Sequence, residues 1–157
     1  MLIEERLQSR FIEKKMTLAL AESITGGAMS ARLVKIPDSS LYFQGSIVAY
    51  ANSAKERFLA VSPDTLHQAH GAVSEKIAEA MAKGAHQQFI SDFSLAVTGI
   101  AGPSGGSPGK PVGTVCFAIV GNTGVLLSWT SHFEGDRLQV IDQATEEAFS
   151  RLLSQIA

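Results

Sequence analysis

Residues 17–21, TLALA, and residues 22–27, ESITGG, decide the fold. The unbroken apolar run is typical of a strand that is buried on both faces of a sheet. The Ser, Thr and Gly residues after it predict a tight turn into a helix over 26–36, which stops before Pro37. A buried strand followed at once by a helix favours an α/β fold.

The rest of the chain continues this alternation of strands and helices. Further strands are expected at 46–50, 93–98, 113–120 and 125–133. The last two are separated by Gly121-Asn122-Thr123-Gly124, which predicts an antiparallel hairpin. Apolar spacing and capping residues predict the remaining helices, which are 3–15, a short helix after Asn52 as N-cap, one after Ser62-Pro63, one after the N-cap Ser74, and 136–156. We therefore expect a layered α/β sandwich of helices around a mixed β-sheet.

Composition limits the classes of protein to which the chain can belong. Its 157 residues are 45% apolar and 18% charged, which predicts a single domain over 1–157 with a substantial core. The net charge of −2 argues against nucleic acid and anionic membranes as partners. The sequence has neither a signal peptide pattern nor 18 consecutive apolar residues, so we expect a cytoplasmic protein without a membrane segment. The apolar composition and short length favour a homodimer.

Ser23 and Lys55 are the candidate catalytic pair. Ser23 lies where the first strand enters Gly26-Gly27, so its hydroxyl can face a ligand while backbone N–H groups there face a developing oxyanion. A helix cap, by Ser23 or by Thr25, explains the same pattern. Lys55 lies in the first turn of a helix, where the helix dipole disfavours its ammonium form; a solvated surface lysine is the alternative. A lysine base needs its pKa lowered by roughly three units, so burial must supply most of the shift.

The region 99–113 is a second candidate binding element. It contains six glycines and three prolines and follows a strand end, where open α/β sheets usually bind ligands. It matches no nucleotide fingerprint, but its backbone N–H groups, with Thr98 and Ser104, can approach a phosphate or carboxamide; an irregular linker is the alternative.

The histidines and the single cysteine are weaker candidates for functional residues. The four histidines show no metal-ligand spacing and are interpreted as surface or core residues. Cys116 lies in an apolar run and is interpreted as a small buried hydrophobic residue. A metal-dependent hydrolase would need clustered His and Asp ligands, so we expect no metal and no cofactor.

Five ordered motifs carry a resemblance to a known family. They are AESITGG at 21–27, YANSAK at 50–55, HGAVS at 70–74, TGIAGP at 98–103 and KPVGT at 110–114. Together they resemble the carboxy-terminal domain of the competence/damage-inducible protein CinA, a family that includes a stand-alone nicotinamide-nucleotide amidase.

The resemblance implies hydrolysis of the carboxamide of nicotinamide mononucleotide to nicotinic acid mononucleotide and ammonia, in pyridine-nucleotide salvage. By position, Ser23 matches the family nucleophile and Lys55 its general base, with Tyr50 beside them. The residues implied to contact substrate are Gly26, Gly27, Ser40, Thr98, Gly99, Gly102 and Arg137.

One position departs from the family pattern. Family members often have a second arginine where this chain has Ile141, which falls on the apolar stripe of the last helix and is expected to pack inward. Loss of that arginine leaves a second interpretation open, in which the chain is a nucleotide-binding or interaction module with weak or no catalysis.

Overall fold

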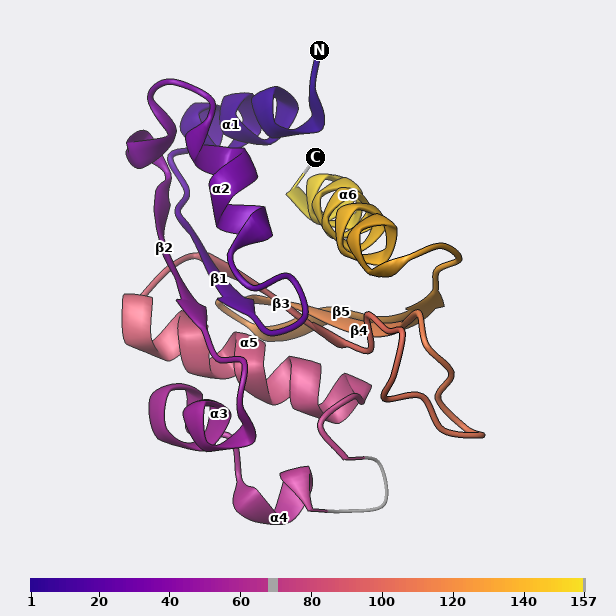
Figure 1. The fold of residues 1–157 in the computed structure, drawn as a ribbon. Coiled ribbons are helices and arrows are strands. Elements are labelled where there is room, and N and C mark those ends of the chain that lie inside the picture. The colour runs from indigo at the N-terminus through magenta and orange to yellow at the C-terminus, as the bar shows by residue number, and fades with distance from the viewer. Residues whose placement is uncertain (68–70, 157) are drawn as a thin grey trace.

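A five-stranded sheet with helices on both faces forms the architecture of the computed structural model, which describes residues 1–67 and 71–156 (Figure 1). The strands are Leu18–Glu22 (β1), Phe43–Val48 (β2), Phe93–Gly99 (β3), Thr114–Gly121 (β4) and Gly124–His132 (β5). The helices are Ile3–Lys14 (α1), Ala28–Val34 (α2), Asn52–Leu59 (α3), Pro63–Leu66 (α4), Glu75–Phe89 (α5) and Arg137–Ile156 (α6), with a 3₁₀ turn at Ser39–Leu41 (η1).

The strand order is β2-β1-β3-β4-β5. Strand β1 pairs in parallel with both β2 and β3, while β3 with β4 and β4 with β5 are antiparallel. The connection from β1 to β2 runs through α2 on one face, and the connection from β2 to β3 runs through α3, α4 and α5 on the other (Figure 1). The carboxyl ends of the three parallel strands therefore form a switch point of the kind at which α/β sheets bind ligands.

The two faces of the sheet have side chains of different size. Leu18, Leu20 and Phe117 belong to the core beneath α1, α2 and α6. Ala21 and Ala96 belong to the core beneath α3 and α5. Because small side chains allow close approach, the second layer of helices can pack nearer to the sheet than the first.

The predicted mixed α/β sandwich is confirmed, and so is the antiparallel hairpin of β4 and β5. The N-cap Ser74 is also confirmed, since its hydroxyl accepts a hydrogen bond from Ile77 N at 3.1 Å. On α6, the expected apolar stripe is buried at Val140, Ala144, Ala148, Leu152 and Ile156.

Two predicted caps are wrong. Ala51 occupies the N-cap position of α3, and Asn52 is the first residue of the helix. The N-cap of α2 is Gly27, whose φ of 107° suits glycine, rather than Ser23 or Thr25. The predicted helix over 26–36 is correspondingly shorter, because Gly26 and Gly27 belong to the turn before it.

Candidate active site

Three parallel strands deliver the side chains of the candidate site at their carboxyl ends. Ser23 follows β1, Tyr50 lies two residues after β2, and Thr98 lies at the end of β3. Lys55 approaches from the first turn of α3, which begins just after β2. A cavity of about 200 Å³ lies between these elements and is lined by Ser23, Ile24, Tyr50, Asn52, Lys55, Ala72, Val73, Thr98, Gly99, Ala101 and Arg137.

Ser23 and Lys55 form the central contact of this cavity. Lys55 Nζ lies 3.0 Å from Ser23 Oγ, although the two residues are 32 positions apart in the sequence. The amine also donates to the backbone carbonyl of Tyr50 at 3.1 Å. The distance to Ser23 is within the range expected for a nucleophile and its base.

Burial controls the charge of the Lys55 amine. The side chain is only 2% exposed, and burial lowers the pKa of its ammonium group. Within residues 1–67 and 71–156, no carboxylate lies at ion-pair distance to offset that loss of hydration. The neutral amine, which is the form that can accept a proton, is therefore favoured relative to a solvated lysine.

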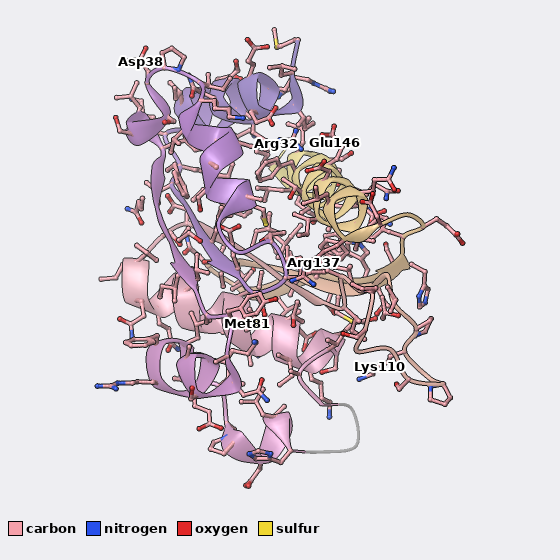
Figure 2. The ribbon with its side chains drawn as sticks, in the orientation of Figure 1. Arg32, Asp38, Met81, Lys110, Arg137 and Glu146 are labelled. Atoms are coloured by element: carbon pink, nitrogen blue, oxygen red, sulfur yellow. The ribbon has the colours of Figure 1, made fainter. Side chains whose placement is uncertain are left out.

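Arg137 and Tyr50 form the rim of the cavity. The Arg137 guanidinium donates to the Tyr50 hydroxyl at 2.9 Å and to the Gly102 carbonyl at 2.8 Å. It thereby links the start of α6 to the segment after β2 and to the glycine-rich region 99–113. Arg137 is labelled in Figure 2. The side chains of Tyr50 and Arg137 are both exposed to solvent, so the planar, positively charged guanidinium lies at the entrance of the cavity.

Thr98 and Gly99 form the floor on the β3 side. The Thr98 hydroxyl is buried and donates to the Ala72 carbonyl at 2.9 Å, which fixes the neighbouring cavity wall. A side chain at Gly99 would meet Ile24, Thr114 and Val115 atoms at 2.9 Å. Position 99 therefore has no room for a larger residue without moving the cavity wall.

Comparisons with known proteins agree on one family. The CinA C-terminal domain matches residues 2–156. A CinA-like protein of Mycolicibacterium gilvum is 48% identical over 136 residues, which cover 87% of this chain and 32% of that protein. A CinA-like protein of Geobacter metallireducens is 53% identical over 135 residues, covering 86% of this chain and 32% of that protein. The chain belongs to the CinA C-terminal domain family. It spans about a third of the length of these curated relatives.

Solved structures of the CinA superfamily share the fold. The competence-damaged protein (CinA) superfamily protein of Escherichia coli has a TM-score of 0.93 and 35% identity, covering 98% of this chain and 88% of the other. The competence/damage inducible protein of Agrobacterium tumefaciens has a TM-score of 0.92 and 35% identity, covering 97% and 92%. The α/β architecture is thus that of the CinA superfamily.

The structure brings together six of the residues named from the CinA resemblance. Ser23, Tyr50, Lys55, Thr98, Gly99 and Arg137 all line the cavity. Tyr50 contacts Lys55 through its backbone carbonyl, while its side chain contacts Arg137. Gly102 lies outside the lining and accepts from Arg137 through its carbonyl.

Three other predicted substrate contacts do not reach this cavity. Gly26 N donates to the Ser23 carbonyl at 3.1 Å, and Gly27 N donates to a Glu22 carboxylate oxygen at 3.2 Å. Both backbone N–H groups are therefore occupied within the protein and neither glycine lines the cavity. Ser40 is exposed in η1, which precedes β2, whereas the cavity lies at the opposite, carboxyl end of that strand.

Sequence reasoning missed Ile24, Asn52, Ala72, Val73 and Ala101 in the lining, and it missed the charged residue Glu22 behind it. Glu22 is fully buried at the end of β1, next to Ser23, and its carboxylate accepts hydrogen bonds from the turn and from α2. The signal was present, because a charged residue at the end of an apolar strand must find partners if it is buried.

The other reactive groups lie away from Ser23. His67 is exposed, His86 contacts Asn122, and His132 contacts Thr114, while His70 lies outside the described residues. Cys116 is buried as predicted, and burial raises the pKa of its thiol. Within the described ranges, no group of three or more His, Cys, Asp or Glu side chains could hold a metal ion. No helix in those ranges has the length and apolar content needed to cross a bilayer.

Ile141 packs inward as predicted. It is half-buried against the core beneath α6, one turn after Arg137. Ile141 does not line the cavity, whereas Arg137 does.

Proposed function

We propose that this CinA-family protein is an amidohydrolase that converts nicotinamide mononucleotide to nicotinic acid mononucleotide and ammonia. The observation that carries the proposal is the contact between a buried, uncompensated lysine amine and the Ser23 hydroxyl at 3.0 Å, on the wall of a small cavity. That arrangement is suited to nucleophilic catalysis by a serine without a histidine.

In the first step, the Lys55 amine accepts the Ser23 proton while Ser23 Oγ attacks the carboxamide carbon. One N–H of the neutral amine donates to the Tyr50 carbonyl, and this bond directs the lone pair of Nζ toward Ser23. The step forms a C–O bond, and the carbonyl π electrons move to the oxygen to give a tetrahedral oxyanion.

The backbone N–H of Ile24 is the candidate donor to that oxyanion. Ile24 directly follows Ser23 and lines the cavity, and its N–H meets no acceptor in the described part of the chain. The N–H groups of Ser23, Gly26 and Gly27 already have acceptors within the protein. A well-aimed donor of this kind contributes about 3 kcal/mol to stabilising the transition state.

Collapse of the intermediate breaks the C–N bond. The Lys55 ammonium returns its proton to the leaving nitrogen, and ammonia departs from an acyl-Ser23 ester. Water then attacks the ester, with Lys55 again taking the proton, and this step releases the carboxylic acid and restores the Ser23 hydroxyl.

Arg137 would hold the phosphate of the substrate. The cavity of about 200 Å³ suits the carboxamide-bearing ring, while the ribose phosphate would extend to the rim, where the guanidinium lies. A bidentate guanidinium matches the geometry of phosphate oxygens.

The test is ammonia release from nicotinamide mononucleotide by the wild type, Ser23→Ala and Lys55→Ala. Each substitution is expected to lower kcat by at least about a hundredfold, because nucleophile and base act as a unit. Ser94→Ala and Lys83→Ala are matched controls, since Ser94 is buried on the same sheet and Lys83 lies exposed on α5. Equal activity of all five proteins would eliminate the dyad.

A nucleotide-binding module without turnover is the second candidate, and Ile141 is the observation that favours it. Ile141 packs on the core, so among the described residues it does not supply the second rim cation that the family resemblance implies. Calorimetry that detects nicotinamide mononucleotide binding, together with no ammonia release, would favour this function over hydrolysis.

A further inference from the structure

The carboxylate of Glu22 is the most densely hydrogen-bonded side chain near the proposed nucleophile. It is 0% exposed and lies one residue before Ser23. Its Oε1 accepts from Thr25 Oγ1 at 2.8 Å, Met29 N at 3.0 Å and Gly27 N at 3.2 Å. Its Oε2 accepts from Ser46 Oγ at 2.9 Å, Ser30 N at 3.3 Å and the Ser30 hydroxyl.

These hydrogen bonds argue against a direct chemical role for Glu22. Six donors surround the two oxygens of the carboxylate, which is more than the roughly four lone-pair sites that these oxygens offer, so no acceptor site is left for a substrate. Glu22 does not line the cavity, and its side chain lies on the α2 face of the sheet with Leu18 and Leu20. Glu22 is therefore unsuited to exchange protons with a substrate. It can affect the reaction only by fixing the positions of the residues to which it is hydrogen-bonded.

Glu22 is bonded to the segment that carries Ser23 and to the strand that leads to α3 and Lys55. Its bonds to Thr25 and Gly27 fix the turn that begins at Ser23. Its bond to Ser46 fixes β2, and its backbone carbonyl accepts from Ala49 N at 2.9 Å, immediately before Tyr50.

We propose that Glu22 is a positioning residue that sets the separation and alignment of Ser23 and Lys55. This inference rests on the proposed hydrolytic function for its kinetic readout. A misplacement of about 1 Å can cost roughly a hundredfold in rate, so loosening the turn lowers turnover more than substrate binding.

Thr25→Val tests the positioning role without removing the carboxylate. It deletes the hydroxyl bond to Glu22 and keeps the size and branching of the side chain. Thr145→Val is the matched control, because Thr145 is equally buried and donates one bond of 2.9 Å within α6, remote from the cavity. The melting temperatures of the two variants are expected to fall by similar amounts. The kcat of Thr25→Val falls roughly tenfold with KM nearly unchanged, while Thr145→Val keeps wild-type kcat.

Glu22→Gln and Glu22→Ala separate geometry from charge. Glutamine keeps one oxygen that accepts from the turn, and its NH₂ group can donate to the hydroxyl oxygens of Ser30 and Ser46, so that only the long bond from Ser30 N at 3.3 Å is lost. Positioning therefore predicts that Glu22→Gln retains much more kcat than Glu22→Ala. Glu4→Gln, at a buried carboxylate that pairs with Arg32, is the control for loss of a buried charge.

A second readout distinguishes this inference from the proposed function. The rate at which a fluorophosphonate modifies Ser23, followed by intact mass, needs no knowledge of the substrate, and it should fall in Thr25→Val but not in Thr145→Val. Labelling that depends on Thr25, without any ammonia release by the wild type, would support the positioning role and refute the amidase. Full kcat and labelling in Thr25→Val would overturn the positioning role. So would a Glu22→Gln protein as inactive as Glu22→Ala. Absence of both labelling and ammonia release in the wild type would overturn both ideas.

Discussion

Replacement of Lys55 by methionine tests whether the amine is neutral in the folded protein. Methionine has a similar length and is apolar, so it can occupy the buried site without the cost of removing an amine from water. We expect Lys55→Met to be inactive and, at neutral pH, more stable than the wild type. This combination is unusual, because most substitutions of buried residues destabilise a protein.

The sign and size of the effect follow from proton linkage. Burial lowers the pKa of Lys55 below 10.5, so between the lowered pKa and 10.5 the unfolded state binds one proton more than the native state. The free energy of unfolding of the wild type therefore rises with pH in this window, by at most about 1.4 kcal/mol per pH unit for one group. Lys55→Met lacks this contribution, so its stability advantage should shrink as the pH approaches 10.5.

Urea unfolding of both proteins at several pH values from neutral to just below the titration of tyrosine provides the measurement. Lys83→Met on the exposed face of α5 is the control and should follow the wild type at every pH. Parallel stability curves for the wild type and Lys55→Met would mean that the amine stays protonated in the fold. In that case Lys55 could not act as the base, and the mechanism would be refuted.

Three further substitutions test other parts of the structure. The Tyr42 hydroxyl is buried with no partner in the described ranges, so Tyr42→Phe should raise the free energy of unfolding by about 1 kcal/mol at neutral pH, measured by urea unfolding; a loss of stability would contradict this. Burial, with the charge of Glu4, raises the pKa of Tyr42 to about 12 from 10.0. The stability of the wild type should therefore fall by about 3 kcal/mol relative to that of Tyr42→Phe as the pH rises through that interval. A Cβ at Gly84 would lie 2.1 Å from the Leu59 carbonyl oxygen of α3. Gly84→Ala should therefore lower the free energy of unfolding by about 1–3 kcal/mol, and it should lower kcat because it displaces the helix that carries Lys55. A wild-type melting temperature would contradict the contact. Arg137→Lys should raise KM for nicotinamide mononucleotide by at least about tenfold with a smaller change in kcat, because an ammonium cannot reproduce the paired donors of the planar guanidinium. An unchanged KM would mean that Arg137 does not bind the phosphate.

Local patterns in the sequence were sufficient to predict the architecture. The apolar run before Ser23, the turn between β4 and β5 and the stripe on α6 each reflect a single element and its immediate neighbours. Capping was harder to predict, because several Ser, Thr and Asn residues compete near each helix start. At α2 the polar side chain of Thr25 is bonded to Glu22, which leaves Gly27 at the cap.

The site was predictable only in part, since its geometry depends on contacts between distant segments. Strand ends and family motifs led to Ser23, Lys55 and Thr98, whose positions follow from the parallel order of β2, β1 and β3. Ser40 lies away from this cavity, at the amino end of β2, and a motif position does not tell at which end of a strand a residue lies. Glu22 was missed because its role arises from six donors that the fold gathers around it.

The burial of Lys55 follows from the packing of the second layer of helices, and this connects the fold to the chemistry. The strands facing that layer carry Ala21 and Ala96, and α5 has Gly84 where the end of α3 crosses it. Small residues at these positions allow α3 to lie close to both α5 and the sheet, which places its first turn against the carboxyl end of β1. The amine is thus desolvated by close packing instead of being stabilised by an ion pair. Any change that widens this layer should raise the pKa of Lys55 toward that of a solvated lysine, and activity at neutral pH should fall even when Ser23 and Lys55 are both intact.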